Sequence, residues 1–289
     1  MARILIPLPR RDFDPSEVAV SWQRLHADGH EVIFATPDQQ AASADELMLT
    51  GMGLDPWGWL PGVNRLRLVG LLLRANRDAR DAHAAMLQDA AFRAPLCWDA
   101  LNTTTFDGLL LPGGHRARGM REYLESPLLQ SVVAGCFDAG KPVAAICHGV
   151  LLAARSRSSI NGKSVLFGRR TTALTWALEK KAAATARISR FWDPYYYRTY
   201  RDAPGQPVGY MSVQQEVTRA LADPRDFMDV PLDAPDYRRK TNGLARDSDT
   251  DTSPAFVVRD GNYLSARWPG DVHRFAREFS AMFDNRRLG

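Results

Sequence analysis

The stretch from Val143 to Arg155, VAAICHGVLLAAR, determines how the rest of the chain is interpreted. It places Cys147 and His148 between an apolar run typical of a buried strand and an apolar run typical of a helix. In a parallel α/β sheet, ligands collect beyond the carboxyl ends of the strands, where this turn would lie. A cysteine in such a turn is similar to the nucleophile elbow of hydrolases, but a small buried hydrophobic residue would look the same.

The helix that follows the turn predicts a reactive thiol. The positive end of a helix favours a thiolate, so we expect a lowered pKa for Cys147. Backbone N–H groups in the same turn are suited to stabilising an oxyanion. Upstream, the strand-like run GLLLPGG ends in Gly113 and Gly114, which bring bare backbone amides close to a substrate. Parallel topology would place these glycines beside Cys147.

The same strand and helix pattern recurs along the chain. ARILIPL, DPSEVAVSWQRLHADGH and EVIFATP read as strand, helix and strand, and SPLLQSVVAGCFDAGKP reads as a helix before the Cys147 strand. Near the end, AFVVRDGNYLSARWP predicts a hairpin around Asp260 and Gly261, and GDVHRFAREFSAMFDNRR predicts an amphipathic helix. The prediction is an α/β, flavodoxin-like sandwich, with a mostly parallel central sheet covered by helices on both faces.

Two segments interrupt this pattern. Residues from about 39 to 102 contain a Gly/Pro/Trp-rich loop and an Ala/Arg-rich helical stretch, and residues from about 191 to 252 contain an aromatic cluster, several prolines and a polar run. Structureless connections of this length are uncommon inside a compact domain. We therefore expect residues 1–289 to form one domain, with both segments as insertions that pack over or beside the sheet.

Composition excludes several classes of protein. The chain has 289 residues, 45% of them hydrophobic, a net charge of +4 and three widely spaced cysteines, Cys97, Cys136 and Cys147. Its apolar runs are far shorter than the roughly 20 residues that span a bilayer, and there is no signal-peptide pattern. The cysteine count favours reduced thiols in the cytoplasm and argues against a structural metal. The arginines are scattered along the chain, which argues against nucleic acid as a partner.

Four motifs in order identify a known family. FDGLLLPGGH, KPVAAICHGVLLAA, INGKSVL and VVRDGNYLSARWPGDVHRFAREF together resemble the ThiJ/PfpI superfamily, which has the fold of the class I glutamine amidotransferases. The similarity covers the amino-terminal unit and most of residues 106–180 and 255–283, and it leaves the two insertions unmatched. The His after PGG is like that of the chaperone-glyoxalase branch. The resemblance also implies a homo-oligomer.

The resemblance implies roles for individual residues. Cys147 matches the family's nucleophile and His148 the residue beside it. Glu17, in the first turn of the first helix, matches the acid that hydrogen-bonds the cysteine sulfur; to do so it would have to be desolvated and protonated. Gly114 and the backbone N–H of His148 match the oxyanion pocket, with Gly113 and His115 on either side of Gly114.

Glu179 is the candidate for a third catalytic position. In the chaperone-glyoxalase branch an acidic residue about thirty positions after the cysteine orients the histidine, and Glu179 stands at a similar distance. In WALEKKAAATA the same glutamate is also what a solvent-facing helix position would carry. Without a carboxylate partner for His148, an acyl-transfer triad is not expected.

Three functions remain open. The first is a glyoxalase III or deglycase-like enzyme without a cofactor, which acts on small reactive carbonyls through a hemithioacetal at Cys147. The second is an amidase or peptidase that uses the same cysteine on an amide substrate. The third is a stress chaperone or redox sensor without turnover.

Overall fold

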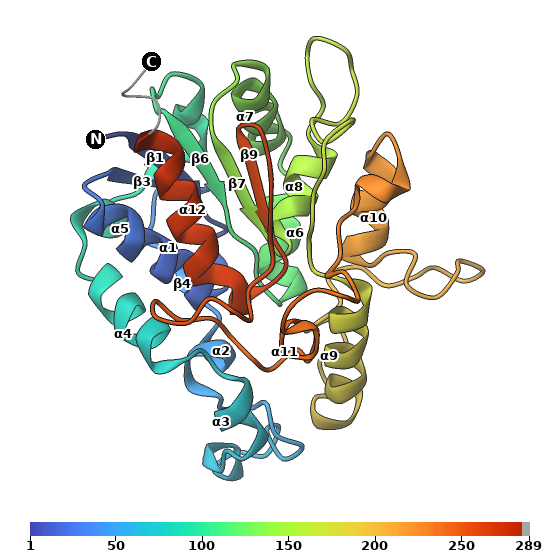
Figure 1. The fold of residues 1–289 in the computed structure, drawn as a ribbon. Helices are drawn as coiled ribbons and strands as arrows, with labels where there is room; N and C mark the ends of the chain where they lie inside the picture. Colours follow the sequence, from blue (N-terminus) through green and yellow to red (C-terminus); the bar gives the residue numbers. More distant parts are fainter. Residues whose placement is uncertain (285–289) are drawn as a thin grey trace.

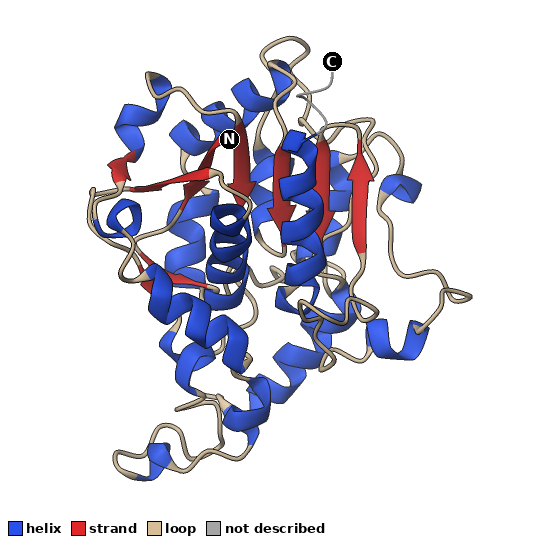
Figure 2. Ribbon diagram, turned by 60° about the vertical axis from the view of Figure 1, so that its left-hand side comes forward, coloured by secondary structure: helices blue, strands red, loops and turns tan. Residues whose placement is uncertain are grey.

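The computed structural model describes residues 1–284 and contains a seven-stranded central sheet (Figure 1). Its strand order is β5-β3-β1-β6-β7-β9-β8, and every neighbouring pair is parallel except β8 and β9. Figure 2 shows the edge strand β8 pointing in the opposite direction to the adjacent β9. The strands span Leu96–Cys97 (β5), Glu31–Thr36 (β3), Arg3–Pro7 (β1), Gly108–Leu111 (β6), Val143–Ile146 (β7), Tyr263–Ala266 (β9) and Val257–Asp260 (β8). A separate parallel pair joins β2 (Arg11–Phe13) to β4 (Ser43–Ala44).

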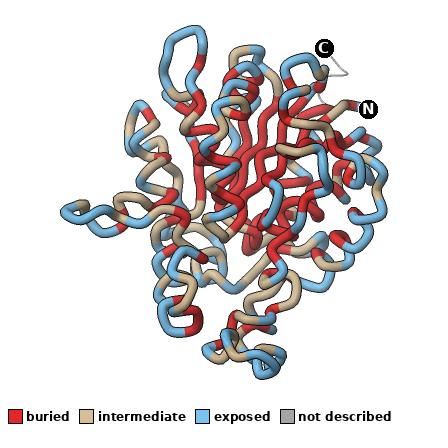
Figure 3. Tube along the Cα trace, turned by 180° about the vertical axis from the view of Figure 1, so that it is seen from behind, coloured by how far each residue is buried: buried red, intermediate tan, exposed pale blue. Residues whose placement is uncertain are grey.

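Helices cover both faces of the sheet, as predicted. One face carries α1 (Pro15–Ala27), α4 (Arg77–Met86) and α12 (Val272–Asp284), and the other carries α6 (Ala117–Leu124), α7 (Pro127–Asp138) and α8 (Gly149–Arg155). Side chains along β1 alternate between the two cores: Ile4 and Ile6 pack into one, and Leu5 packs into the other. Figure 3 shows the continuous buried strands that result.

Local signals place the ends of several elements correctly. The Asp14 side chain caps α1 by accepting hydrogen bonds from the backbone N–H groups of Ser16 and Glu17. Ser126 caps α7, with Pro127 in its first turn. β8 and β9 form the predicted hairpin, and α12 is the closing helix; Asn285 and the two arginines after it lie outside the described residues.

The segment 39–102 contributes more to the core than the insertion model predicts. It contains α2 (Glu46–Thr50), α3 (Val69–Leu73), α4, α5 (Ala90–Arg93) and two 3₁₀ helices, Val63–Arg65 and Trp98–Asn102. Its strand β5 extends the central sheet by pairing with β3, and Ala82 and Met86 of α4 are buried in the core beside α1. The burial of α4 is hard to predict because its small alanine side chains give a weak apolar pattern. The strand β5 is hard to predict because two residues are too few to show a period.

The second segment is built differently. It follows α9 (Trp176–Ser189) and contains α10 (Val213–Ala220), α11 (Tyr237–Thr241) and a 3₁₀ helix at Pro224–Asp226, and another 3₁₀ helix at Pro269–Asp271 precedes α12. The two segments meet where the Tyr196 hydroxyl donates a hydrogen bond to Asp45, at 2.9 Å. In Figure 1, α2, α3, α9 and α11 gather below the end of the sheet at which β7 leads into α8. Among residues 1–284 no helix has the length and apolarity needed to cross a membrane.

Close packing of α8 on the sheet predicts a large effect of one methyl group. A Cβ on Gly149 would collide with the Leu111 carbonyl oxygen and would lie 2.8 Å from that of Pro112. Both neighbours are backbone atoms and cannot rotate away, so we expect Gly149→Ala to lower the free energy of unfolding by about 3 kcal/mol in urea denaturation.

Gly135, inside α7, provides the matched control. A Cβ at this position would meet no atom within 4 Å. Because alanine is the better helix former, Gly135→Ala is expected to raise stability by about 0.5–1 kcal/mol. Equal stabilities of the Gly149→Ala protein and the native protein would contradict the packing described for α8.

Candidate active site

Cys147 lies in a strained turn between β7 and α8. Its φ of 56° is in the left-handed region, which residues other than glycine seldom adopt. The backbone is held there because the Cys147 N–H donates to the Ala266 carbonyl of β9, at 3.1 Å. The turn therefore has the geometry of a nucleophile elbow, which points the side chain away from the strand.

Glu17 lies in the first turn of α1, on the face of the sheet opposite α8, and its side chain reaches this turn. It is fully buried, and its Oε2 accepts a hydrogen bond from the Gly113 N–H at 2.6 Å. Burial raises the pKa of Glu17 well above its usual range, the nearby charge of Asp14 raises it further, and a hydrogen bond joins Glu17 to the Cys147 side chain. The raised pKa favours the protonated carboxyl, the form in which Glu17 can act as an acid.

The thiol itself differs from the sequence prediction. Burial raises the pKa of Cys147 well above the usual range of a thiol, and the charges of Glu17 and Asp14 act in the same direction. The backbone N–H of His148 favours the thiolate, as a helix N-terminus should, but this effect is smaller. The predicted lowering of the pKa is therefore wrong, because the 1% exposure of Cys147 outweighs the helix.

The glycine loop allows these groups to approach one another. A Cβ on Gly113 would lie 2.7 Å from the backbone nitrogen of His148 and 3.1 Å from Cβ of Cys147. Because any larger residue would push the loop away, glycine at this position brings the amides after β6 against the elbow. The structure thus brings Cys147, His148, Glu17 and the Gly113–Gly114 loop together.

His148 contacts the sulfur through one ring nitrogen. Its Nδ1 lies 3.4 Å from the Cys147 Sγ, while Nε2 has no hydrogen-bond partner among the described residues. Burial lowers the pKa of His148 to about 3, with further contributions from His115 and Arg155. The imidazole is therefore neutral at physiological pH.

His115 lies beside this group on the wall of the same cavity. Its Nδ1 is 3.5 Å from an oxygen of Asp14, and its ring stacks on Tyr196 with centroids 6.1 Å apart. Burial lowers the pKa of His115 to about 3, and the positive charge of Arg246 contributes. A second neutral imidazole therefore faces the site.

Glu179 is buried, but it does not hydrogen-bond to His148. Its Oε1 pairs with Arg198 at 3.0 Å, and its Oε2 accepts from the backbone N–H of Val213, also at 3.0 Å. Burial raises the pKa of Glu179 to about 7. Glu179 therefore neither orients His148 nor faces solvent, the two roles considered from the sequence. Its hydrogen bonds instead link α9 to the start of α10.

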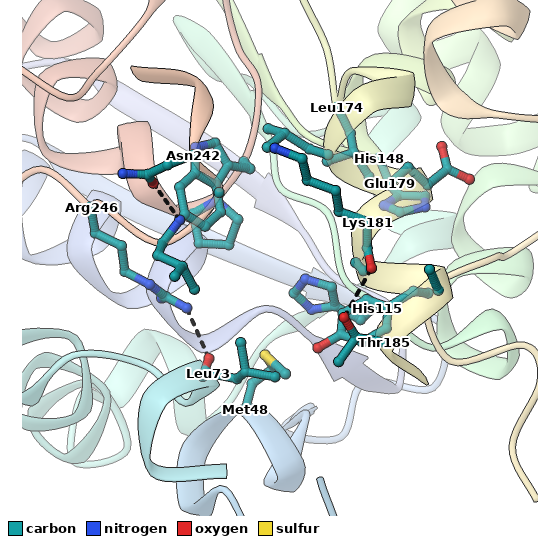
Figure 4. Close-up of a pocket in the computed structure, with 18 residues that line it drawn as sticks. Met48, Leu73, His115, His148, Leu174, Glu179, Lys181, Thr185, Asn242 and Arg246 are labelled. Carbon is teal, nitrogen blue, oxygen red and sulfur yellow. Dashed lines mark hydrogen bonds between the residues drawn. The ribbon is translucent and has the colours of Figure 1, made fainter. Parts of the chain in front are cut away.

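A cavity of about 480 Å³ opens beside the two histidines (Figure 4). Its walls are mostly apolar side chains from α2, α3, α9 and the segment before β8. The polar groups that reach it include His115, His148, Glu179, Tyr197 and Arg246. The two segments expected as insertions thus build much of the wall opposite the elbow.

Two residues of the site escaped the sequence analysis. Asp14 caps α1 and raises the pKa of both Glu17 and Cys147; the Asp-Pro-Ser-Glu order at the start of that helix was a usable signal for the cap. Arg246 reaches the cavity from a polar stretch with no recognisable pattern. Within residues 1–284 no group of three or more His, Cys, Asp or Glu side chains is placed to hold a metal ion.

The raised pKa of Cys147 predicts a late alkylation profile. A raised pKa means that the thiolate fraction is small at pH 7 and grows only above the usual thiol range. In a Cys97→Ser, Cys136→Ala background, the rate of iodoacetamide alkylation should still be rising above pH 9. A plateau reached below pH 8 would show instead that the thiol is acidic.

Known structures share this fold at low sequence identity. The Rapid Encystment Protein of 24 kDa from Francisella tularensis matches with a TM-score of 0.56 and 12% identity over 97% of this chain and 98% of that one. Glyoxalase III from Candida albicans matches with a TM-score of 0.55 and 14% identity over 97% and 96% of the two chains. A ThiJ/PfpI domain protein from Brachyspira murdochii gives 0.51 and 13% over 98% and 96%.

The sequence matches a family model but no individual curated protein. A family model described as ThiJ/PfpI family-like matches residues 8–206, which include the elbow, the glycine loop, Glu17 and much of the cavity wall. This confirms the family inferred from the motifs, and the chain belongs to the ThiJ/PfpI-like family; the match also spans residues 39–102, which the motifs had left unmatched.

Proposed function

We propose that the protein is a cysteine-dependent enzyme that acts on small reactive carbonyl compounds such as methylglyoxal. The observation that carries the proposal is the position of Cys147. It lies in a strained elbow, between a buried acid of raised pKa and the neutral imidazole of His148, which lines a cavity of about 480 Å³. That a protein named glyoxalase III has the same fold supports the choice of substrate class.

The first step is addition of the thiol to the aldehyde. As the sulfur–carbon bond forms and the carbonyl π bond breaks, the thiol proton passes to Nδ1 of His148, and the carbonyl oxygen takes a proton from Glu17. The N–H groups of Gly114 and His148 stabilise the developing negative charge on that oxygen. The product is a hemithioacetal on Cys147.

The second step moves a proton between neighbouring carbons. Ionised Glu17 removes the hydrogen on the former aldehyde carbon while protonated His148 protonates the ketone oxygen, which gives an enediol. Glu17 then returns the proton to the second carbon, while the hydroxyl group on the sulfur-bearing carbon loses its proton to His148. The product is a hydroxy acid thioester on Cys147, which water hydrolyses. One carbon is oxidised and its neighbour is reduced, so the reaction needs no electron acceptor and no cofactor.

The alternative, hydrolysis of an amide or peptide, has less support. It needs a histidine that a carboxylate orients and stabilises when charged. Both oxygens of Glu179 are bound elsewhere, and His148 Nε2 has no partner in the described part of the chain. A chaperone or redox sensor without turnover would not use the cavity beside the two histidines.

Two assays on the native protein test the proposal. Methylglyoxal, without added thiol or cofactor, should be converted to lactate. Simple amide and peptide substrates should not be hydrolysed above the background rate. Amide hydrolysis without lactate formation would favour the alternative, and the absence of both activities would favour the non-enzymatic function.

Glu179→Gln separates the two enzymatic functions further. Glutamine keeps an acceptor for the Val213 N–H, and Arg198 keeps its ion pair with Asp202 at 3.0 Å, so the fold should be retained. We expect kcat for methylglyoxal to change by less than about 3-fold, because Glu179 does not contact His148. A loss of about 10²-fold or more would show that Glu179 reaches the imidazole during turnover.

The surroundings of the protein are also part of the proposal. Cys97, Cys136 and Cys147 are all free thiols, Cys97 being half-buried and the other two buried. Free thiols fit the reducing cytoplasm, and we propose that location. A homo-oligomer, expected from the family, remains a prediction that light scattering tests.

A further inference from the structure

Arg246 brings a positive charge to the cavity and forms no direct ion pair within the described residues, although the more distant charges of Asp14, Asp78 and Glu17 act on it. The residue is half-buried, and its guanidinium group donates one hydrogen bond, to the Leu73 carbonyl oxygen at 2.9 Å. It makes no ion pair with any residue between 1 and 284 that the structure describes. A guanidinium group has five N–H donors, so most of its hydrogen-bonding capacity is not used by Leu73.

Other arginines with little exposure to water form direct ion pairs, unlike Arg246. Arg155, Arg190, Arg198 and Arg267 each pair with a carboxylate at 3.0 Å or less. This is the usual arrangement, because an unpaired charge removed from water is costly. The unpaired guanidinium at the cavity therefore has the character of a group that meets an anion from outside the protein.

The position of Arg246 is fixed by its neighbours. The adjacent Asp247 is buried, and its two oxygens accept hydrogen bonds from the backbone N–H groups of His273 and Arg274, at 3.2 and 2.8 Å. Asp247 thereby fastens the chain to the first turn of α12. With Leu73 holding the other end, the guanidinium group is placed in advance, which lowers the entropy lost when it binds an anion.

The cavity has the charge and size for an acid with an apolar body. Glu179 is the acidic side chain among the described lining residues, and both of its oxygens are already bound. Lys181 adds a positive charge at the exposed rim, and most of the remaining wall is apolar. A volume of about 480 Å³ suits a ligand considerably larger than a three-carbon aldehyde.

The stick view gives the order of groups along the cavity. In Figure 4 the Arg246 guanidinium points inward from one wall, His115 lies in the middle, and His148 lies beyond it beside Glu179. A substrate whose carbonyl carbon meets the elbow next to His148 would extend its other end towards Arg246.

We propose, resting on the function proposed above, that Arg246 binds a carboxylate of the substrate. The substrate class is then a reactive aldehyde or 2-oxoaldehyde whose carboxylate is separated from the carbonyl by an apolar chain or ring. Arg246 is a specificity-determining residue in this arrangement, since it contacts the end of the substrate that does not react. Guanidinium and carboxylate match as a two-hydrogen-bond pair.

Calorimetric titration with phenylacetate and phenylacetamide tests this without relying on turnover. The two ligands differ little in shape but only the first is an anion, so the native protein should bind phenylacetate at least about 10-fold more tightly. Arg246→Met should abolish this preference, and Arg246→Lys should retain part of it. Arg187→Met, which removes an exposed arginine of α9 that does not line this cavity, should retain all of it.

Each other result overturns the assignment of Arg246. Equal affinities for the two ligands, no detectable binding of phenylacetate at millimolar concentration, or a preference that persists in Arg246→Met would do so. If Arg246→Met fails to fold in a thermal melt, the ligand pair on the native protein and on Arg246→Lys decides. If the protein prefers phenylacetate but produces no lactate from methylglyoxal, the anion site is supported and the proposed function is refuted. If it produces lactate but shows no preference, the proposed function is supported and the anion site is refuted.

Discussion

Cys147→Ser is expected to lower kcat/KM for methylglyoxal by about 10³-fold or more. Serine keeps the size and the polarity of the side chain, but its hydroxyl is far less nucleophilic than a thiol. The neutral His148, at 3.4 Å from the sulfur, would have to remove a much less acidic proton. The loss should appear in kcat, measured by formation of lactate, because the substitution leaves the cavity walls unchanged.

Cys136→Ala is the matched control for the loss of a buried thiol. Cys136 lies on α7 in the core of the opposite face, and burial raises its pKa to about 12. Its removal should reduce stability modestly and leave kcat/KM within about 2-fold of the native value. Turnover that survives Cys147→Ser would contradict both enzymatic functions at this cysteine.

Glu17→Gln is expected to separate the acidity of the thiol from catalysis. Once Glu17 ionises, its charge raises the pKa of Cys147, so removing the carboxyl should move the rise of the alkylation profile to lower pH. Glutamine can still accept the hydrogen bond from the Gly113 N–H, but it cannot carry a proton between the two carbons. The variant should therefore be alkylated at lower pH than the native protein and yet lose about 10²–10⁴-fold in kcat.

Glu46→Gln is a suitable comparison, because Glu46 occupies the first turn of α2 as Glu17 does in α1 but is exposed. It should change neither the alkylation profile nor kcat. If Glu17→Gln shifts the thiol pKa downwards and turnover rises with it, then Glu17 only tunes the cysteine, and the proton-transfer role assigned to it is wrong.

Features that depend on neighbours in the chain could be predicted from the sequence. The elbow at Cys147 follows from an apolar strand, a short turn and an apolar helix in direct succession, and the α7 cap follows from Ser126 and Pro127. The parallel sheet followed from the repetition of such units. Membership of the family followed from motifs that combine several of these units in order.

Features set by distant packing could not be predicted in this way. The direction of the Cys147 pKa shift depends on burial and on Asp14, which is more than a hundred positions away. Both oxygens of Glu179 are bound by Arg198 and Val213, which lie further along the chain and outside the motifs that identified the family. Arg246 enters the cavity only because Asp247 and Leu73 hold it there.

Under the proposed function, the contact between Arg246 and Leu73 has a consequence for how substrate choice could change by mutation. Cys147, Glu17 and the glycine loop belong to the sheet ends and α1, whereas the far wall of the cavity is formed by α9 and by parts of segments 39–102 and 191–252, which hydrogen bonds join. Reaction chemistry and substrate choice are therefore separable by mutation. If the proposed function holds, joint exchange of the wall residues around Leu73 and Arg246 would change the substrate, and exchange on only one side would leave the two sides of the wall mismatched.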